Sequence, residues 1–226
     1  MPFLFFNSGY LGIMLVGLVL GLITQAWING AYRKWSRVDL YNGKTGAEIA
    51  RTMLDSNGLG SVGIEQIGGS LTDHYDPRTR VLRLSQAVYA GRSVASAGVA
   101  AHEAGHAVQH AQGYAPAVIR QALVPAANIG SQMSWLLIMV GFFLNLSGLV
   151  LVGALVFGAA VLFQLVTLPV EFDASHRAIA VLSAGLPPEQ AAGARSVLNA
   201  AAMTYVAAAL VSIMQFIYFL GLSRRD

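Results

Sequence analysis

Residues 99–108 read VAAHEAGHAV, and within them His102 and His106 stand four positions apart with Glu103 next to the first. In an α-helix, side chains four positions apart lie on one face, so the two imidazoles can bind a single metal ion. Glu103 projects beside them, where its carboxylate can take a proton from a water molecule on that metal. Two ligands and a general base at this spacing are typical of the active-site helix of a zinc peptidase. Small or apolar residues flank the motif on both sides, as a buried helix requires.

The composition of the chain is that of a membrane protein. Of its 226 residues 55% are hydrophobic and only 11% are charged, whereas soluble domains carry about 25% charged residues. Charged residues are absent from three stretches, 1–32, 121–170 and 196–223. Because a membrane-spanning helix needs about 20 apolar residues, these stretches hold one, two and one spans. We therefore predict a mainly α-helical protein with four spans.

The charged residues between the first two spans indicate a small globular domain, and its HExxH helix leads us to expect a zincin-like α+β domain. The first apolar stretch is expected to be a retained anchor, because no basic residue precedes it and no small-residue cleavage site follows it. The predicted parts are an N-terminal transmembrane anchor (1–32), a zincin-like domain with the HExxH helix (33–120), a transmembrane hairpin (121–170), ligand-bearing and amphipathic helices (171–199) and a C-terminal transmembrane helix (200–226).

Local signals place several elements inside the zincin-like domain. Thr45 and Glu48 have the spacing of a capping box, which begins a helix that should end near Gly58. Residues 71–84 read as a β-hairpin, because two strand-like runs flank a turn with proline in its second position. The hairpin leads into the metal helix, which is expected to cover residues 93–112.

The third metal ligand has to come from elsewhere in the chain. A catalytic zinc usually has three protein ligands, and a chain without cysteine must supply them from histidine and carboxylate side chains. Two predicted spans separate His106 from Glu171, so both residues return to the same side of the membrane. Pro169 is expected to end the third span and to begin a polar helix over 170–182 that carries Glu171. His110, or one of the histidine and aspartate residues upstream of the motif, remains an alternative ligand.

Four further residues have side chains suited to roles around the metal. Asp173 can accept a hydrogen bond from a ligand imidazole and so orient it. His74, on the predicted hairpin, and His176 or Arg177, close to Glu171, can stabilise the oxyanion of a tetrahedral intermediate. We therefore add these four residues to the candidate site.

Three motifs resemble those of one known family. HEAGHAVQ at 102–109, LTDHYDP at 71–77 and TLPVEFDAS at 167–175 are similar to motifs of the YugP-type bacterial membrane zinc metallopeptidases. The resemblance covers nearly the whole chain and implies a zinc-dependent protease embedded in the membrane. More remotely, the chain resembles the HtpX group of gluzincins, whose third ligand is a glutamate after a membrane hairpin. That group typically has an acid where this chain has Ser175, so an orienting role would shift to Asp173 or be absent.

The resulting hypothesis is a zinc metallopeptidase that hydrolyses peptide bonds of membrane or unfolded proteins. Glu103 would act as general base, and the strand at 81–84 would pair with an extended substrate. One alternative is a protease that cleaves within the bilayer, which the polar second half of the metal helix disfavours. Another is a membrane protein with a structural zinc site, which would have no use for Glu103.

The expected partners are a polypeptide substrate and the lipid bilayer. The net charge of +3 is modest and fits membrane orientation, so no nucleic-acid partner is expected. Arg33, Lys34 and Arg37 directly follow the first span, and the positive-inside rule places that end in the cytoplasm. We therefore predict a multi-pass protein of the bacterial inner membrane with its active site at the cytoplasmic face.

Overall fold

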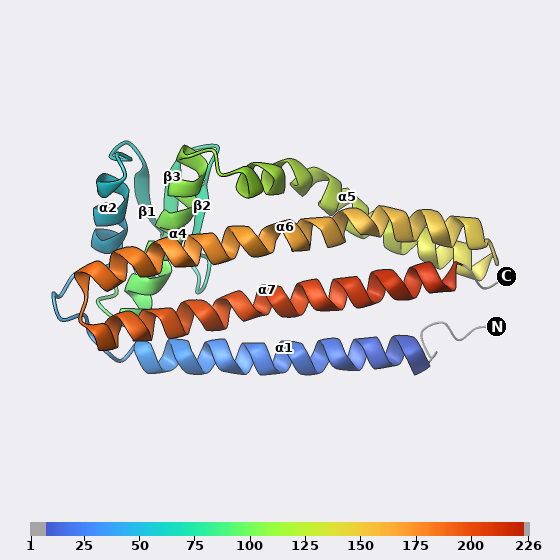
Figure 1. Ribbon diagram of the computed structural model, residues 1–226, viewed down its shortest axis with the longest axis horizontal. Coiled ribbons are helices and arrows are strands. Elements are labelled where there is room, and N and C mark those ends of the chain that lie inside the picture. The colour runs from blue at the N-terminus through green and yellow to red at the C-terminus, as the bar shows by residue number, and fades with distance from the viewer. Residues whose placement is uncertain (1–7, 224–226) are drawn as a thin grey trace. The chain divides into compact units, whose positions relative to one another are not determined.

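The computed structural model describes residues 8–223, so the first seven residues of the expected anchor and the last three residues of the chain lie outside it. The described chain forms two compact units. The first, the apolar unit, contains the residues up to Thr24, Val118–Leu168 and the residues from Thr204. The second, the site unit, contains Gln25–Ala117 and Pro169–Met203. The chain passes between the units several times (Figure 1).

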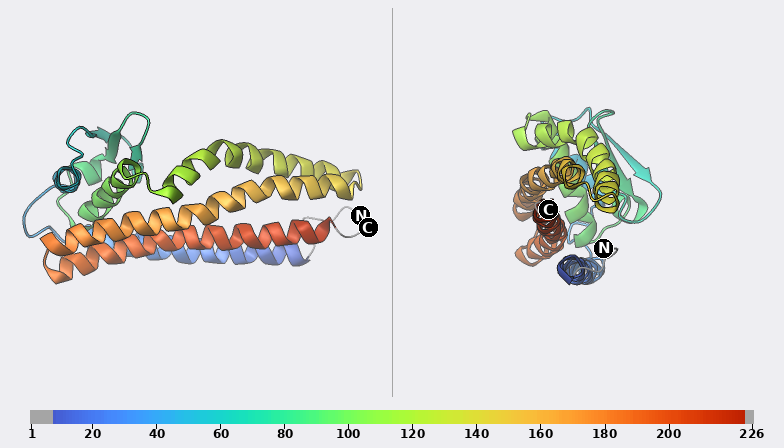
Figure 2. Two further views of the ribbon diagram at one scale, coloured as in Figure 1. Left: turned by 45° about the horizontal axis from the view of Figure 1, so that its top comes forward. Right: turned by 90° about the vertical axis from the view of Figure 1, so that its right-hand side faces the viewer.

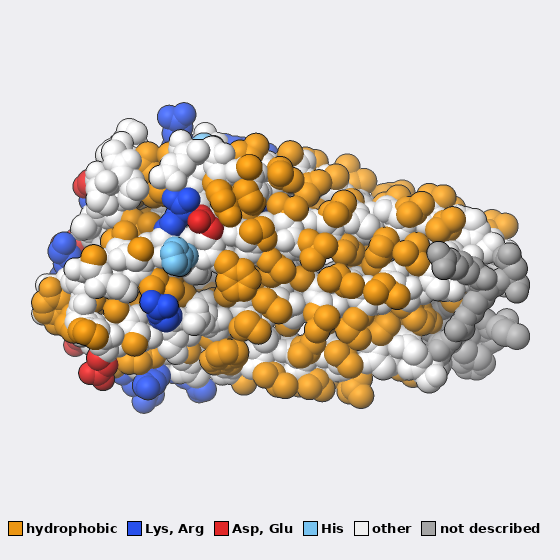
Figure 3. Space-filling model, viewed as in Figure 1, with side chains coloured by type: hydrophobic (Ala, Val, Ile, Leu, Met, Phe, Trp, Pro, Cys, Tyr) orange, Lys and Arg blue, Asp and Glu red, His pale blue; other side chains and the backbone are white. Residues whose placement is uncertain are grey.

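Four helices are long and apolar enough to cross a membrane. They are α1 (Ser8–Trp35), α5 (Ala115–Phe143), α6 (Ser147–Gly185) and α7 (Pro188–Leu222). Large hydrophobic side chains stand exposed along them, for example Leu15 and Ile129, and hydrophobic side chains cover the visible face of the apolar unit (Figure 3). The structure confirms a mainly helical chain with four helices that could each span a membrane.

The helices that carry the third and fourth spans are longer than the sequence indicated. Pro169 was expected to end a span, but α6 continues through it to Gly185, so Glu171 lies within the same helix as the third span. Proline removes one backbone donor from a helix, but membrane helices tolerate this loss. The residues beside Pro169 are apolar and include no glycine. Likewise α7 joins the expected amphipathic stretch and the last span in one helix.

The site unit contains a three-stranded sheet with the order β1-β3-β2. Strands β2 (His74–Asp76) and β3 (Val81–Ser85) form the predicted antiparallel hairpin, with His74 opposite Arg83. Strand β1 (Gly63–Ile67) pairs with β3 in parallel. Both edges of β3 are therefore occupied, and the expectation that strand 81–84 pairs with substrate is wrong. The outer edges of the sheet belong to β1 and β2.

Three further helices complete the site unit: α2 (Gly46–Ser56), α3 (Gln86–Tyr89) and α4 (Val94–Ala111). The predicted capping box begins α2, since Thr45 accepts from the Glu48 N–H and the Glu48 carboxylate accepts from the Thr45 N–H. The Ser93 side chain caps α4, and Gly113, with φ of +61°, follows its end. The strands lie beside α4 in both views of Figure 2.

Small side chains let α6 approach α4 closely. One face of α4 is fully buried and consists largely of alanine, including Ala101 and Ala104. A Cβ atom on Gly105 would lie 2.8 Å from the carbonyl oxygen of Ala174, on α6, which is too short for a real contact. Glycine at 105 therefore permits a backbone approach that brings the second half of α6 against the metal helix.

Candidate metal centre

Two helices of the site unit bring three metal-ligating side chains together. His102 and His106 come from one face of α4, and Glu171 comes from α6. The Glu171 Oε2 atom lies 3.2 Å from His102 Nε2 and 3.7 Å from His106 Nε2. All three ligand atoms lie within 4.8 Å of one another. Ligands of a tetrahedral zinc with bonds of about 2.0–2.1 Å stand roughly 3.3 Å apart, so this geometry fits the ion.

The electrostatics of the group favour a cation. The Glu171 side chain is only 4% exposed, and the two imidazoles are 14–15% exposed. Burial lowers the pKa of His106, but the hydrogen bond that its imidazole donates to Glu171 and the charges of Glu103 and Glu171 raise the pKa more, so its net shift is upward. A buried carboxylate between two imidazoles is stabilised by positive charge, which a bound metal ion supplies as well as a proton. Two imidazole nitrogens and one carboxylate oxygen are a ligand set of catalytic zinc.

Each ligand imidazole has a hydrogen-bond partner on its other nitrogen. His102 Nδ1 lies 3.1 Å from the Ser175 hydroxyl, and His106 Nδ1 lies 3.0 Å from Gln109 Oε1. Such partners are usual for histidines that bind metals, because they hold the ring in orientation. They leave the Nε2 atom of both rings directed at Glu171.

Neither of these two partners was predicted from the sequence. Asp173 was expected to contact a ligand imidazole, but the amide of Gln109 lies between them, and Asp173 Oδ2 accepts from Gln109 Nε2 at 2.7 Å. The signals were present in the spacing: Gln109 stands one helical turn after His106, and Ser175 stands one turn after Glu171.

Glu103 lies beside the metal ligands, close enough for their charges to act on its carboxyl group. Burial raises the pKa of Glu103, the charges of His102 and His106 lower it, and the charge of Glu171 raises it further, so the net shift is upward. Within residues 8–223 its carboxylate makes no hydrogen bond to another side chain or to the backbone. A carboxylate with a raised pKa and no fixed partner is suited to exchange a proton with water.

The remaining candidates lie around the group but not in it. His74 is exposed on β2, and its Nδ1 atom lies 2.8 Å from the carbonyl oxygen of Thr72. His176 is exposed on α6. The guanidinium of Arg177 pairs with Asp173 at 2.5 Å. The roles of these three side chains in stabilising an oxyanion stay predictions.

His110, the alternative ligand, faces a different partner. Its Nδ1 atom lies 3.4 Å from the hydroxyl of Tyr75, on β2, and the two ring centroids are 5.9 Å apart. The convergent group in residues 8–223 consists of His102, His106 and Glu171. The geometry therefore favours Glu171 over His110 as the third ligand.

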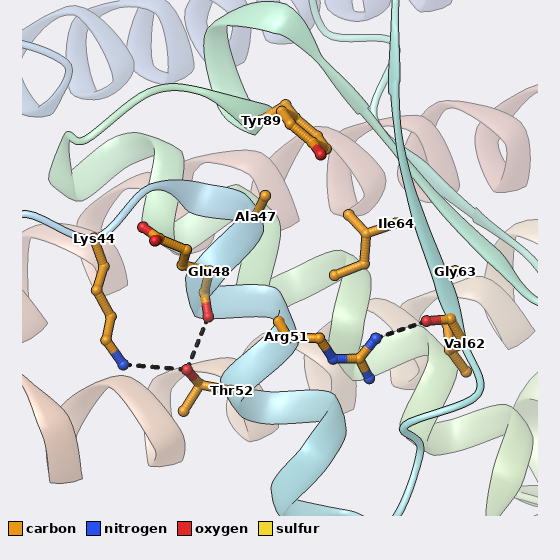
Figure 4. A pocket seen from close by; sticks show the side chains of 9 residues that line it. All are labelled: Lys44, Ala47, Glu48, Arg51, Thr52, Val62, Gly63, Ile64 and Tyr89. Carbon is orange, nitrogen blue, oxygen red and sulfur yellow. Dashed lines mark hydrogen bonds between the residues drawn. The ribbon is translucent and has the colours of Figure 1, made fainter.

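A separate open pocket of about 570 Å³ lies between α2 and β1 (Figure 4). Its polar side chains are engaged with nearby groups: the Lys44 ammonium donates to Thr52 Oγ1 at 3.3 Å, and Arg51 donates to the Val62 carbonyl at 2.8 Å. None of the metal-ligating side chains lines it, so we do not include it in the candidate site. Its lining residues are Lys44, Ala47, Glu48, Arg51, Thr52, Val62, Gly63, Ile64 and Tyr89.

Comparisons with known proteins found a family model and a relative that match most of the chain. Residues 10–224 match a family model described as "Putative neutral zinc metallopeptidase". The chain is 44% identical over 212 residues to a Bacillus subtilis (strain 168) protein named "Putative membrane protease YugP". That alignment covers 93% of this chain and 94% of the relative. No solved structure matches the chain significantly.

Proposed function

Because the chain belongs to this neutral zinc metallopeptidase family, as its motifs indicated, we propose that it hydrolyses peptide bonds of membrane or unfolded proteins. The ligands of the zinc are His102, His106 and Glu171. The observation that carries the proposal is the convergence of Glu171, from α6, on the two histidines of α4. In the same proposal, residues 33–120 form a zincin-like domain and the protein is a gluzincin.

The number of ligands supports catalysis over a structural role for the metal. A structural zinc is closed by four protein ligands, whereas a catalytic zinc keeps one position open for water or substrate. Three ligand side chains converge among the described residues, and Glu103 stands beside them. A membrane protein with a structural zinc site would need a fourth ligand and would leave Glu103 without a function.

The character of α4 supports cleavage outside the hydrocarbon core. Among the described helices, α4 is not one of the four that are long and apolar enough to span a membrane. Its second half carries polar side chains, including Gln109 and His110. Hydrolysis needs water at the metal, and a helix of this kind is suited to a water-accessible surface. This favours the present proposal over cleavage within the bilayer.

The chemistry follows from the positions of the chain's own residues. A bound zinc ion would act as a Lewis acid and lower the pKa of a water molecule to about 7. The Glu103 carboxylate would accept a proton from the attacking water and later deliver a proton to the leaving amine. Glu171 and the two imidazoles would hold the ion, since their ligand atoms lie within 4.8 Å of one another.

The outer edge of β2 is the proposed binding place for an extended substrate. Within the described residues β2 pairs only with β3, and its other edge offers backbone donors and acceptors. Strand β2 also packs against α4, which carries the metal ligands. An extended peptide that adds to this edge would be held by backbone hydrogen bonds, which are independent of side-chain sequence. Such binding suits a protease that takes unfolded segments.

We place the protein in the bacterial inner membrane with its site at the cytoplasmic face. Arg33 and Lys34 lie in the last turn of α1, and basic residues at the end of a span favour the cytoplasmic side. Protease protection of epitope tags at both termini, in inverted and right-side-out vesicles, checks this orientation. Digestion of the C-terminal tag from one side only assigns the side on which α7 ends.

Cleavage of casein by the detergent-purified, zinc-loaded chain tests the proposed activity. Glu103→Gln removes the general base but keeps all three ligands, so cleavage should fall by about 10²–10⁴-fold while one zinc per chain remains bound. Glu65→Gln, an exposed acid on β1, serves as the matched control and should retain activity. Undiminished cleavage by Glu103→Gln contradicts the proposed mechanism. The proposed function is contradicted if the unmodified chain binds zinc but cleaves neither casein nor unfolded membrane segments.

A further inference from the structure

Gln109 is a buried polar residue that connects the metal ligand His106 to α6. Its side chain is 1% exposed and makes three hydrogen bonds. The Oε1 atom lies 3.0 Å from His106 Nδ1. The Nε2 atom donates to the Val170 carbonyl at 2.8 Å and to Asp173 Oδ2 at 2.7 Å.

The two partners on α6 determine which way the Gln109 amide points. A backbone carbonyl and an ionised carboxylate only accept hydrogen bonds, so both require the NH₂ end of the amide. Asp173 Oδ2 also accepts from the guanidinium of Arg177, which can only donate, so this oxygen is an acceptor. A flipped amide would direct its oxygen at two other oxygens in a buried place, which is strongly unfavourable. The Gln109 oxygen must therefore face His106.

An amide oxygen facing His106 Nδ1 determines the tautomer of the imidazole. The oxygen only accepts, so His106 Nδ1 must carry the proton. The lone pair of the neutral ring then lies on Nε2, the atom directed at Glu171. His102 differs, because its Nδ1 partner is the Ser175 hydroxyl, which can donate or accept. The tautomer of His106 is thus determined by its surroundings, and that of His102 is not determined by Ser175 alone.

We propose that Gln109 is a positioning residue that holds His106 in the Nδ1–H tautomer with Nε2 directed at the metal, and that Asp173 acts on His106 through Gln109. The proposal rests on the zinc site of the proposed function but not on proteolysis. It explains why a buried glutamine stands one turn after the second ligand histidine. In this proposal Asp173 acts on a ligand imidazole through Gln109 and not by the direct contact that was expected.

Zinc affinity of the full chain in detergent, measured by competition with a chelator, tests the proposal. Gln109→Met keeps the length of the side chain and removes all three hydrogen bonds, so the Kd for zinc should rise by about 10–100-fold. Gln66→Met, at an exposed position on β1, is the matched control and should leave the Kd unchanged. An unchanged Kd in Gln109→Met, whether or not its Tm falls, overturns the proposal.

A nitrogen NMR readout separates positioning from a general structural role, and its first observation needs only the wild type. In the zinc-loaded, ¹⁵N-histidine-labelled wild type, His106 should show zinc on Nε2 and a protected proton on Nδ1. In Gln109→Met that Nδ1 proton should exchange faster, while the resonances of His74 stay in place. Zinc on Nδ1 of His106, or an Nδ1 proton unaffected by Gln109→Met, contradicts the proposal.

A double-mutant cycle tests whether Asp173 acts through Gln109. Asp173→Ala should weaken zinc binding several-fold in the wild type and have no further effect in Gln109→Met. Losses that multiply in the double variant would show that Asp173 acts independently, and would overturn that part of the proposal. A wild type that binds zinc and passes these tests but cleaves no protein would leave the positioning role intact and contradict only the proposed function.

Discussion

Helices α4 and α6 both supply ligands to the candidate metal centre, but they do so by different means. The two histidines of α4 belong to one local pattern, since residues four positions apart share a helical face. Glu171 lies beyond α5 and inside α6, the second candidate span helix after α4, and only tertiary packing brings it to the histidines. The position of the two histidines is therefore determined by helical periodicity, and that of Glu171 by how closely the two helices approach.

Removing the ligand that α6 supplies should have the largest effect on zinc binding. Glu171→Ala keeps both histidines, but two imidazoles alone are a poor zinc site. We expect the Kd for zinc to rise by more than about 100-fold, the upper limit usual for the loss of a residue that only hydrogen-bonds to a ligand. Casein cleavage should be lost. Competition with a chelator measures the Kd for zinc, and Glu189→Ala, at the start of α7, is the control. Equal zinc affinity in Glu171→Ala and the wild type would show that α4 holds the metal without α6, either through its two ligand histidines or with His110 as a third.

Gly105→Ala tests the close approach of the two helices. The added Cβ would lie 2.8 Å from the Ala174 carbonyl oxygen, so α6 must move away. We expect a loss of about 1–3 kcal/mol in the free energy of unfolding together with weaker zinc binding. At Gly98, also on α4, the nearest atom to an added Cβ would be 3.6 Å away. Gly98→Ala should therefore be neutral or stabilise the helix by about 0.5–1 kcal/mol. Equal thermal shifts in the two variants would contradict a special approach at Gly105.

The hydroxyl that contacts His102 should matter less than the ligands themselves. Ser175→Ala removes the partner of His102 Nδ1, and we expect zinc binding to weaken by about tenfold, the low end for such partners. Ser183→Ala, at an exposed position on the same helix, should leave the Kd unchanged. Titration of both variants with zinc against a chelator compares them directly. A loss as large as that of Glu171→Ala would mean that Ser175 does more than orient the ring.

The smallest effect is expected in the hairpin, a feature that follows from local sequence alone. The Asp76 carboxylate accepts hydrogen bonds from Arg83, Thr79 and the Arg78 N–H, and these hold its pKa well below the usual range. A lowered pKa stabilises the fold at pH values above the unfolded pKa of about 3.9, and this contribution is lost as the pH falls further. Asp76→Asn should therefore lower the Tm at neutral pH, and the difference should shrink in acid. A difference that grows in acid would contradict this assignment.

Local features of the fold were largely predictable from the sequence. The Thr45–Glu48 capping box, the turn after Asp76 and the bounds of α4 all depend on residues within a few positions of one another. The four spans follow from uncharged stretches that are long enough to cross a bilayer. In each case the interactions that determine the element lie inside the pattern that predicts it.

Features set by tertiary contacts were not predictable in the same way. The parallel pairing of β1 with β3 depends on a crossover and not on either strand's sequence, so the wrong strand was expected to face substrate. Helix α6 continues through Pro169, a residue that by itself favours the end of a helix. Gln109 reads as an ordinary polar residue until α6 supplies two acceptors for its amide.

X-ray absorption spectroscopy of the zinc-loaded chain tests the central claim most directly, since it counts the ligands of the metal. Two imidazoles, one carboxylate and one water-derived oxygen at about 2.0–2.2 Å are the predicted set, and Glu171→Ala should lose the carboxylate while Glu103→Gln keeps the full set. A third imidazole, from His110, or a closed set of four protein ligands would contradict a centre built by α4 and α6 with one position open for catalysis.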